Sequence, residues 1–146
     1  MKRIILAALL STTAFAQQAP VVQHAASIES KAKKLTRAEF DTLLQHPDHL
    51  LLIDVRRPDE ISAIGGFAVY LNVQIADLKN HLDEIPRDKV IVTISNHAAR
   101  AGVAADLLAG HGFNVAGAIG VQTYEAEGGA VQKFPAPQHI TTGAAQ

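Results

Sequence analysis

The fold can be predicted from one stretch of the sequence, Val90-Ile91-Val92-Thr93-Ile94-Ser95-Asn96-His97-Ala98-Ala99-Arg100-Ala101-Gly102-Val103-Ala104-Ala105-Asp106-Leu107-Leu108. Its apolar run up to Ile94 predicts a strand that is buried on both faces, and the periodic apolar residues after Arg100 predict a helix. A turn between such a strand and helix collects unpaired backbone N–H groups, where the helix dipole adds positive potential. The sequence therefore predicts an anion-binding loop made of Ser95, Asn96, His97, Ala98, Ala99 and Arg100.

Other apolar runs extend this pattern in both directions. Residues 50–55 predict a second buried strand, and residues 68–73 and 113–116 predict two shorter ones. Strands that alternate with helices indicate an α/β fold with a mostly parallel sheet of about five strands and helices on both faces. Ligands of such sheets bind beyond the carboxyl ends of the strands, so Asp54 and Arg56 are predicted to line the cleft beside Ser95.

The predicted helices carry recognisable end signals. Thr36-Arg37-Ala38-Glu39 fits a capping box, and the helix that it starts must end before Pro47. Pro58 suits a first helical turn, and Gly65-Gly66 breaks the short helix that follows. We also expect a helix from the spacing of Ile75, Leu78 and Leu82, a left-handed C-cap at Gly112, and a last helix over residues 122–127.

The first 16 residues have the pattern of a secretory signal peptide. Lys2 and Arg3 give a basic start, residues 4–10 are an apolar run too short to span a bilayer, and Ala14-Phe15-Ala16 is a cleavage site. We expect cleavage after Ala16 and a periplasmic or secreted protein. We further expect a flexible leader over residues 17–30, one folded domain over 31–134 and a disordered tail over 135–146.

Composition excludes several classes of function. Removal of Lys2 and Arg3 from the 13 basic residues leaves 11 against 14 acidic ones, a formal charge of −3, which does not favour nucleic acid or a membrane as partner. The chain has no cysteine, which excludes a disulfide, a thiolate nucleophile and a thiolate metal site. Its seven histidines show no paired spacing on one helix face, so we expect no metal site, even at His46 and His49, and no cofactor. We expect a monomer.

Several segments together resemble the rhodanese-like domain, the sulfurtransferase module, over about residues 33–134. They are 51–56 with 58–60, then 82–86 with 88–92, the six-residue loop ending in Arg100, the alanine-rich helix with Gly112-Phe113, and Gly120 with Tyr124. The resemblance implies a rhodanese-like α/β fold. In active members the loop reads Cys, four residues, Arg, and the cysteine carries sulfur as a persulfide. A loop of this length resembles the sulfurtransferases rather than the related phosphatases, whose loop is one residue longer.

Ser95 stands at the position of that cysteine, and Arg100 at the position of the closing arginine. A hydroxyl stays protonated and cannot carry a persulfide, so we expect a domain without sulfurtransferase activity that binds a small anion or a protein partner. Two alternatives are a hydrolase that uses Ser95 as nucleophile with His97 as base, and an engineered serine in an active domain. The loop also lacks the family's usual glycine, and residues 64–68 replace the family's Gly-His-Ile-Pro-Gly.

Each site residue has a structural role as well as a functional one. Ser95 is expected to satisfy backbone groups of the loop rather than to attack a substrate, because a working serine needs a histidine oriented by a carboxylate. Arg100 either clamps an anion or is a solvated cation. Asp54 is expected to hold the loop or pair with an arginine, and Arg56 either forms a salt bridge or lines the cleft.

Overall fold

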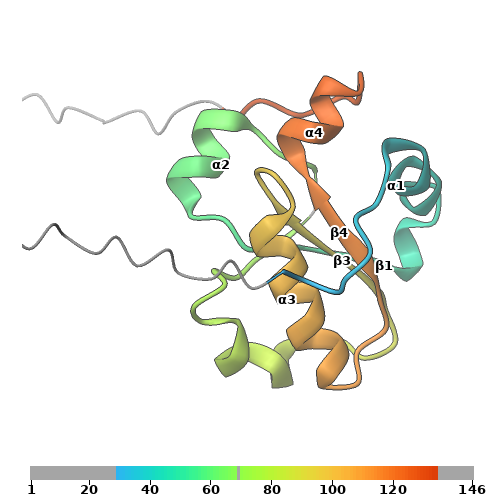
Figure 1. Ribbon diagram of the computed structural model, residues 1–146, viewed down its shortest axis with the longest axis vertical. Helices are drawn as coiled ribbons and strands as arrows, with labels where there is room; N and C mark the ends of the chain where they lie inside the picture. The colour runs from blue at the N-terminus through green and yellow to red at the C-terminus, as the bar shows by residue number, and fades with distance from the viewer. Residues whose placement is uncertain (1–28, 69, 135–146) are drawn as a thin grey trace, which may run out of the picture.

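The computed structural model describes residues 29–68 and 70–134. The predicted signal peptide, most of the leader and the tail lie outside these residues. Figure 1 shows the arrangement of the elements, which are α1 (Arg37–Leu44), η1 (Pro47–His49), β1 (Leu50–Asp54), α2 (Pro58–Ile64), β2 (Leu71–Asn72), η2 (Leu78–Glu84), β3 (Val90–Ser95), α3 (Ala99–Gly110), β4 (Val115–Gly120) and α4 (Val121–Ala126), where η denotes a 3-10 helix.

A parallel sheet with strand order β2-β1-β3-β4 forms the centre of the domain. The predicted α/β architecture is confirmed, with four strands in the described part of the chain where about five were expected. Residues 33–35 run along the free edge of β4, but only Lys34 forms a bridge, with Ala118. The N–H of Leu35 donates to Ala118 O at 2.8 Å, and the N–H of Ala118 donates to Lys33 O at 2.8 Å. This edge contact is too short to count as a strand.

Alternate residues of β1 and β3 serve two hydrophobic cores. On one face Leu52, Val92 and Ile94 pack with a cluster that includes Phe40 of α1 and Tyr124 of α4. On the other face Ile53 and Ile91 pack with η2 and α3, and α3 lies in front of the strands in Figure 1. Both faces of β3 are thus covered, which explains why its sequence is continuously apolar.

Several predicted boundaries are wrong. The strand expected over 68–73 is only Leu71–Asn72, and the one expected over 113–116 is Val115–Gly120. The later start of β4 has a clear cause: the N–H of Phe113 donates to Leu108 O at 3.1 Å, so Phe113 is held by the turn that follows α3. The segment with helical spacing is the 3-10 helix η2, and α4 begins one residue before the predicted helix.

The predicted end signals are confirmed. Thr36 and Glu39 form a reciprocal capping box at the start of α1. The helix α2 ends at Gly65, whose φ of 93° favours glycine, and Gly112 adopts a φ of 79° after α3. Among the described residues no helix is long and apolar enough to cross a membrane.

Candidate functional site

The sheet register brings the predicted site residues to one edge. Ser95, the last residue of β3, pairs with Gly120, the last residue of β4, and Asp54 of β1 pairs with Ile94 next to Ser95. Residues 96–98 then lead directly into α3. Parallel strands end together, so the loop 95–100 and the turn after Asp54 lie at the same edge of the sheet.

Ser95 is buried, with a relative exposure of 1%. Its hydroxyl oxygen accepts a hydrogen bond from the backbone N–H of Ala101 at 3.2 Å. Ala101 is the third residue of α3, a position whose N–H has no partner within the helix and is commonly satisfied by a capping side chain. Ser95 thus performs this capping contact from outside the helix, while the N-cap residue itself, Ala98, has no side chain able to do so.

The remaining N–H groups of the loop are available. In the described part of the chain, the backbone N–H groups of residues 96–100 donate no hydrogen bond to any acceptor. They belong to the residues that lead into, and begin, a helix of 12 residues, where the aligned peptide dipoles place positive potential. Backbone N–H groups at a helix N-terminus are the donors with which proteins commonly bind anions.

Arg100, predicted as an anion clamp or a solvated cation, pairs instead with Glu60 of α2. Its Nη1 donates to Glu60 Oε2 at 2.9 Å and its Nη2 to Oε1 at 2.5 Å, in a bidentate arrangement. Glu60 is 15% exposed and Arg100 36%. The hydrogen bonds from Arg100 lower the pKa of Glu60 from 4.5 to about 2, so the carboxylate stays charged near neutral pH.

Asp54 and Arg56, predicted to line the cleft, form a salt bridge beneath the surface. Arg56 is 0% exposed and Asp54 1%. Arg56 Nε donates to Asp54 Oδ1 at 2.9 Å, and Nη2 donates to Oδ2 at 2.6 Å. The turn that carries them is fixed by Asn72, whose side-chain amide donates to the carbonyl oxygens of both residues. Of the two roles left open for Arg56, the salt bridge is the observed one.

Asn96 connects the two ion pairs. Its Oδ1 accepts from Arg56 Nη1 at 3.3 Å, and its Nδ2 donates to Glu60 Oε1 at 2.8 Å. Its carbonyl oxygen accepts from the N–H of Gln122 in α4 at 3.1 Å. Asn96 is therefore held by contacts with α2, α4 and the turn after β1.

The loop lies close against Gly120. A Cβ at Gly120 would come within 2.9 Å of Ala98 N and of His97 C, and 3.0 Å of Asn96 O, which are all backbone atoms. Ala98, one of the inner loop residues, adopts a left-handed conformation with φ 65°. This conformation costs a residue with a Cβ only roughly 1 kcal/mol. The loop can therefore adopt it without a glycine.

His97, the candidate base, is exposed, whereas Ser95 is buried. Within the described residues no histidine hydrogen-bonds to Ser95 Oγ, whose partner is Ala101 N–H. The structure brings together Ser95, Asn96, Arg100, Asp54 and Arg56, and it adds Glu60 and Gly120 to them. Sequence reasoning did not single out Glu60 as a site residue. The opposite charges of Glu60 and Arg100 are the signal from which their pairing could have been predicted.

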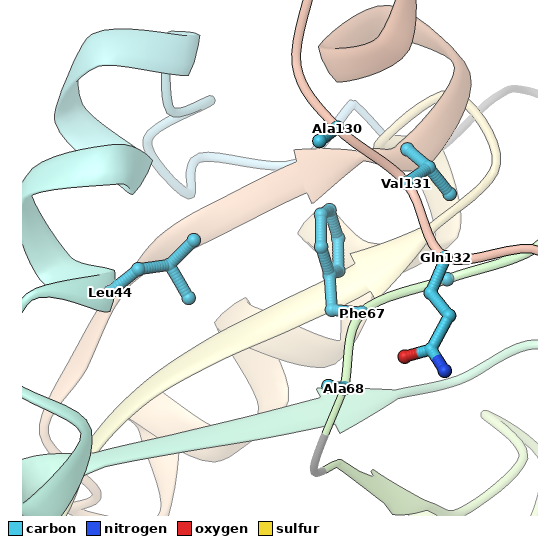
Figure 2. Close-up of a pocket in the computed structure, with 7 residues that line it drawn as sticks. Leu44, Phe67, Ala68, Ala130, Val131 and Gln132 are labelled. Carbon is cyan, nitrogen blue, oxygen red and sulfur yellow. The ribbon is translucent and has the colours of Figure 1, made fainter.

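A separate groove of about 420 Å³ lies away from the loop. Leu44 of α1, residues 66–68 and residues 130–132 line it, and in Figure 2 the side chain of Leu44 points toward Phe67. A smaller pocket is lined by His46 and His49 among apolar residues. In the described chain no group of three or more histidine, cysteine, aspartate or glutamate side chains is arranged to hold a metal ion.

Comparison with known proteins gives structural matches only. No family model and no curated protein matches the chain. A rhodanese-related protein from Thermoplasma volcanium is 26% identical with a TM-score of 0.59, over 68% of this chain and 97% of that one. The polysulfide-sulfur transferase homodimer from Wolinella succinogenes is 26% identical with a TM-score of 0.58, over 75% and 84%.

A third match is a single-domain sulfurtransferase from Saccharomyces cerevisiae. It is 25% identical to this chain, with a TM-score of 0.55, over 70% of this chain and 96% of the yeast chain. These matches cover 84–97% of the length of the three known chains. The chain therefore has the rhodanese-like α/β fold, and its structural neighbours are rhodanese-like and sulfurtransferase domains.

Proposed function

We propose that this chain is an exported rhodanese-like domain without sulfurtransferase activity, and that its loop 95–100 binds a small anion. The observation that carries the proposal is the combination of a buried Ser95, which is engaged by the N–H of Ala101, with five neighbouring N–H groups that have no acceptor in the described residues. Because Ser95 is engaged in this way, the loop has no nucleophile. The N–H groups without an acceptor form the binding site for the anion.

The chemical argument concerns the atom at the first loop position. A thiolate attacks the sulfane sulfur of thiosulfate, releases sulfite and holds the sulfur as a persulfide, which cyanide then removes as thiocyanate. The pKa of a free thiol is about 8.5, within reach of the positive potential of the loop, whereas a serine hydroxyl stays protonated. The chain has no cysteine that could replace it.

The activity test compares three proteins in a thiosulfate:cyanide sulfurtransferase assay. Wild type and Ser95→Ala should give the same background rate. Ser95→Cys should form a persulfide, visible as a mass increase of one sulfur atom, because the N–H groups around the loop remain. Sulfur transfer by wild type above the Ser95→Ala background would refute the loss of activity.

The binding test is a titration of 15N-labelled protein with sodium sulfate and sodium nitrate. Binding in the loop should shift the amide signals of residues 96–100, since these N–H groups are the donors. An unchanged spectrum with both salts would refute the anion-binding role. Export is tested separately by the N-terminal sequence of the protein recovered outside the cytoplasm, which should begin at Gln17.

A further inference from the structure

We propose that Glu60 determines the charge of the bound anion and makes the loop select a monovalent over a divalent ion. The inference rests on the proposed anion-binding function of the loop 95–100. It concerns a residue of α2 that reaches the loop only through side-chain contacts. No step of it requires chemistry at Ser95.

The first argument is the charge balance of the side chains at the loop. Arg100 is paired with Glu60 by two hydrogen bonds, and Arg56 is paired with Asp54 by three. The two arginines and the two carboxylates sum to zero. Arg57, whose Nη1 lies 3.8 Å from Glu60 Oε2, is itself paired with Asp59 and does not change this sum. Asn96, whose side chain contacts Arg56 and Glu60, is neutral, and so is Ser95.

The second argument is the charge that remains. With the side chains balanced, the positive potential at the loop comes from backbone N–H groups and the dipole of α3, which is equivalent to about half an elementary charge. One negative charge is matched by hydrogen bonds from these groups. A second negative charge would lie beside the carboxylates of Glu60 and Asp54 without a cation to compensate it.

The third argument is that Glu60 is held in place. Its Oε1 accepts from both Arg100 and Asn96, and its Oε2 accepts from both Arg100 and the backbone N–H of Arg57. The pKa of this carboxyl is lowered to about 2, so it remains an anion throughout the working pH range. An arriving ligand would have to displace this bidentate partner to recruit Arg100.

The experiment measures dissociation constants for nitrate and sulfate at pH 8, from the amide shifts of residues 96–100. Wild type should bind nitrate at least tenfold more tightly than sulfate. Glu60→Gln keeps an oxygen that can accept from the Arg57 N–H but removes the charge, which leaves Arg100 free to pair with a ligand. This variant should lower the nitrate preference at least tenfold, through tighter sulfate binding.

Two further variants complete the design. Glu84→Gln makes the same change in net charge in η2, where the side chain is 70% exposed, and it should leave the preference unchanged. The double variant Glu60→Gln with Arg100→Gln restores the neutral balance and should return the preference to the wild-type value. Thermal unfolding of each variant verifies that it is folded before titration.

Each outcome separates this inference from the proposed function. If wild type binds sulfate as tightly as nitrate, or if Glu60→Gln leaves the ratio unchanged, Glu60 does not set the selectivity although the loop binds anions. If neither salt shifts the amides of residues 96–100 in any variant, the loop is not an anion site and both proposals are wrong. A nitrate preference that falls at least tenfold in Glu60→Gln and returns to the wild-type value in the double variant supports both.

Discussion

Ser95 Oγ accepts a hydrogen bond from the backbone N–H of Ala101, six residues further along the chain, at 3.2 Å. The contact joins the end of β3 to the first turn of α3 and closes the loop 95–100. It gives Ser95 a structural role. A hydroxyl oxygen performs this task better than sulfur, which is a weak acceptor.

Replacement of Ser95 by alanine should therefore destabilise the domain. Loss of the acceptor leaves the Ala101 N–H without a partner in a buried position, at a cost of about 1 kcal/mol, the usual value of a capping side chain. Urea unfolding followed by circular dichroism measures the difference. A Ser95→Ala variant as stable as wild type would show that the hydrogen bond contributes nothing.

Gly120→Ala should displace the loop. The added Cβ would meet backbone atoms of residues 96–98 at 2.9–3.0 Å, and backbone cannot rotate away as a long side chain can. We expect a loss of about 1–3 kcal/mol in the free energy of unfolding, together with weaker anion binding. Gly110→Ala is the matched control, because nothing lies within 4 Å of a Cβ there and alanine favours the helix by roughly 0.5–1 kcal/mol. Equal effects of the two changes would contradict the close approach.

Arg56→Met should strongly destabilise the domain. It leaves the Asp54 carboxylate, 1% exposed, without its guanidinium partner, and removal of one member of a buried ion pair costs about 3–5 kcal/mol. The adjacent pair of Arg57 and Asp59 provides the comparison, since its side chains are 58% and 68% exposed. Arg57→Met should not measurably change the urea midpoint. Similar midpoints for both variants would mean that the buried pair is not required.

The ion pair between Glu60 and Arg100 should make stability depend on pH. Because the pKa of Glu60 is lowered in the folded state from 4.5 to about 2, its stabilising contribution is complete above pH 4.5 and is lost as the pH falls toward 2. Glu60→Gln should cost about 1 kcal/mol at pH 7, a modest value because Arg100 is 36% exposed. Urea unfolding at pH 7 and pH 3 should show a smaller difference between the two proteins at pH 3. A difference that stays constant would mean that the ion pair does not stabilise the fold.

Local patterns were sufficient to predict the central elements and the place of the loop. The apolar runs at 50–55 and 90–94 correspond to β1 and β3, because strands covered on both faces need apolar side chains at every position. The capping box at Thr36 and Glu39 and the glycine ends of α2 and α3 depend on nearest neighbours in sequence, so they were also predictable. The bounds of β2 and the bridge at Lys34 were not, because they depend on pairing partners far away in the chain.

What the sequence by itself determined is the side chain at the first position of the loop. Ser95 has a hydroxyl group and the chain has no cysteine, and folding cannot change either fact. What only the tertiary structure decided is which charges the loop presents. Arg100 lies 40 residues from Glu60 and Asn96 lies 40 residues from Arg56, and each pair meets because β1 and β3 are neighbours that end at one edge of the sheet. The interaction between charged side chains depends on the distances between them in space, and these distances cannot be read from the positions of the residues in the sequence.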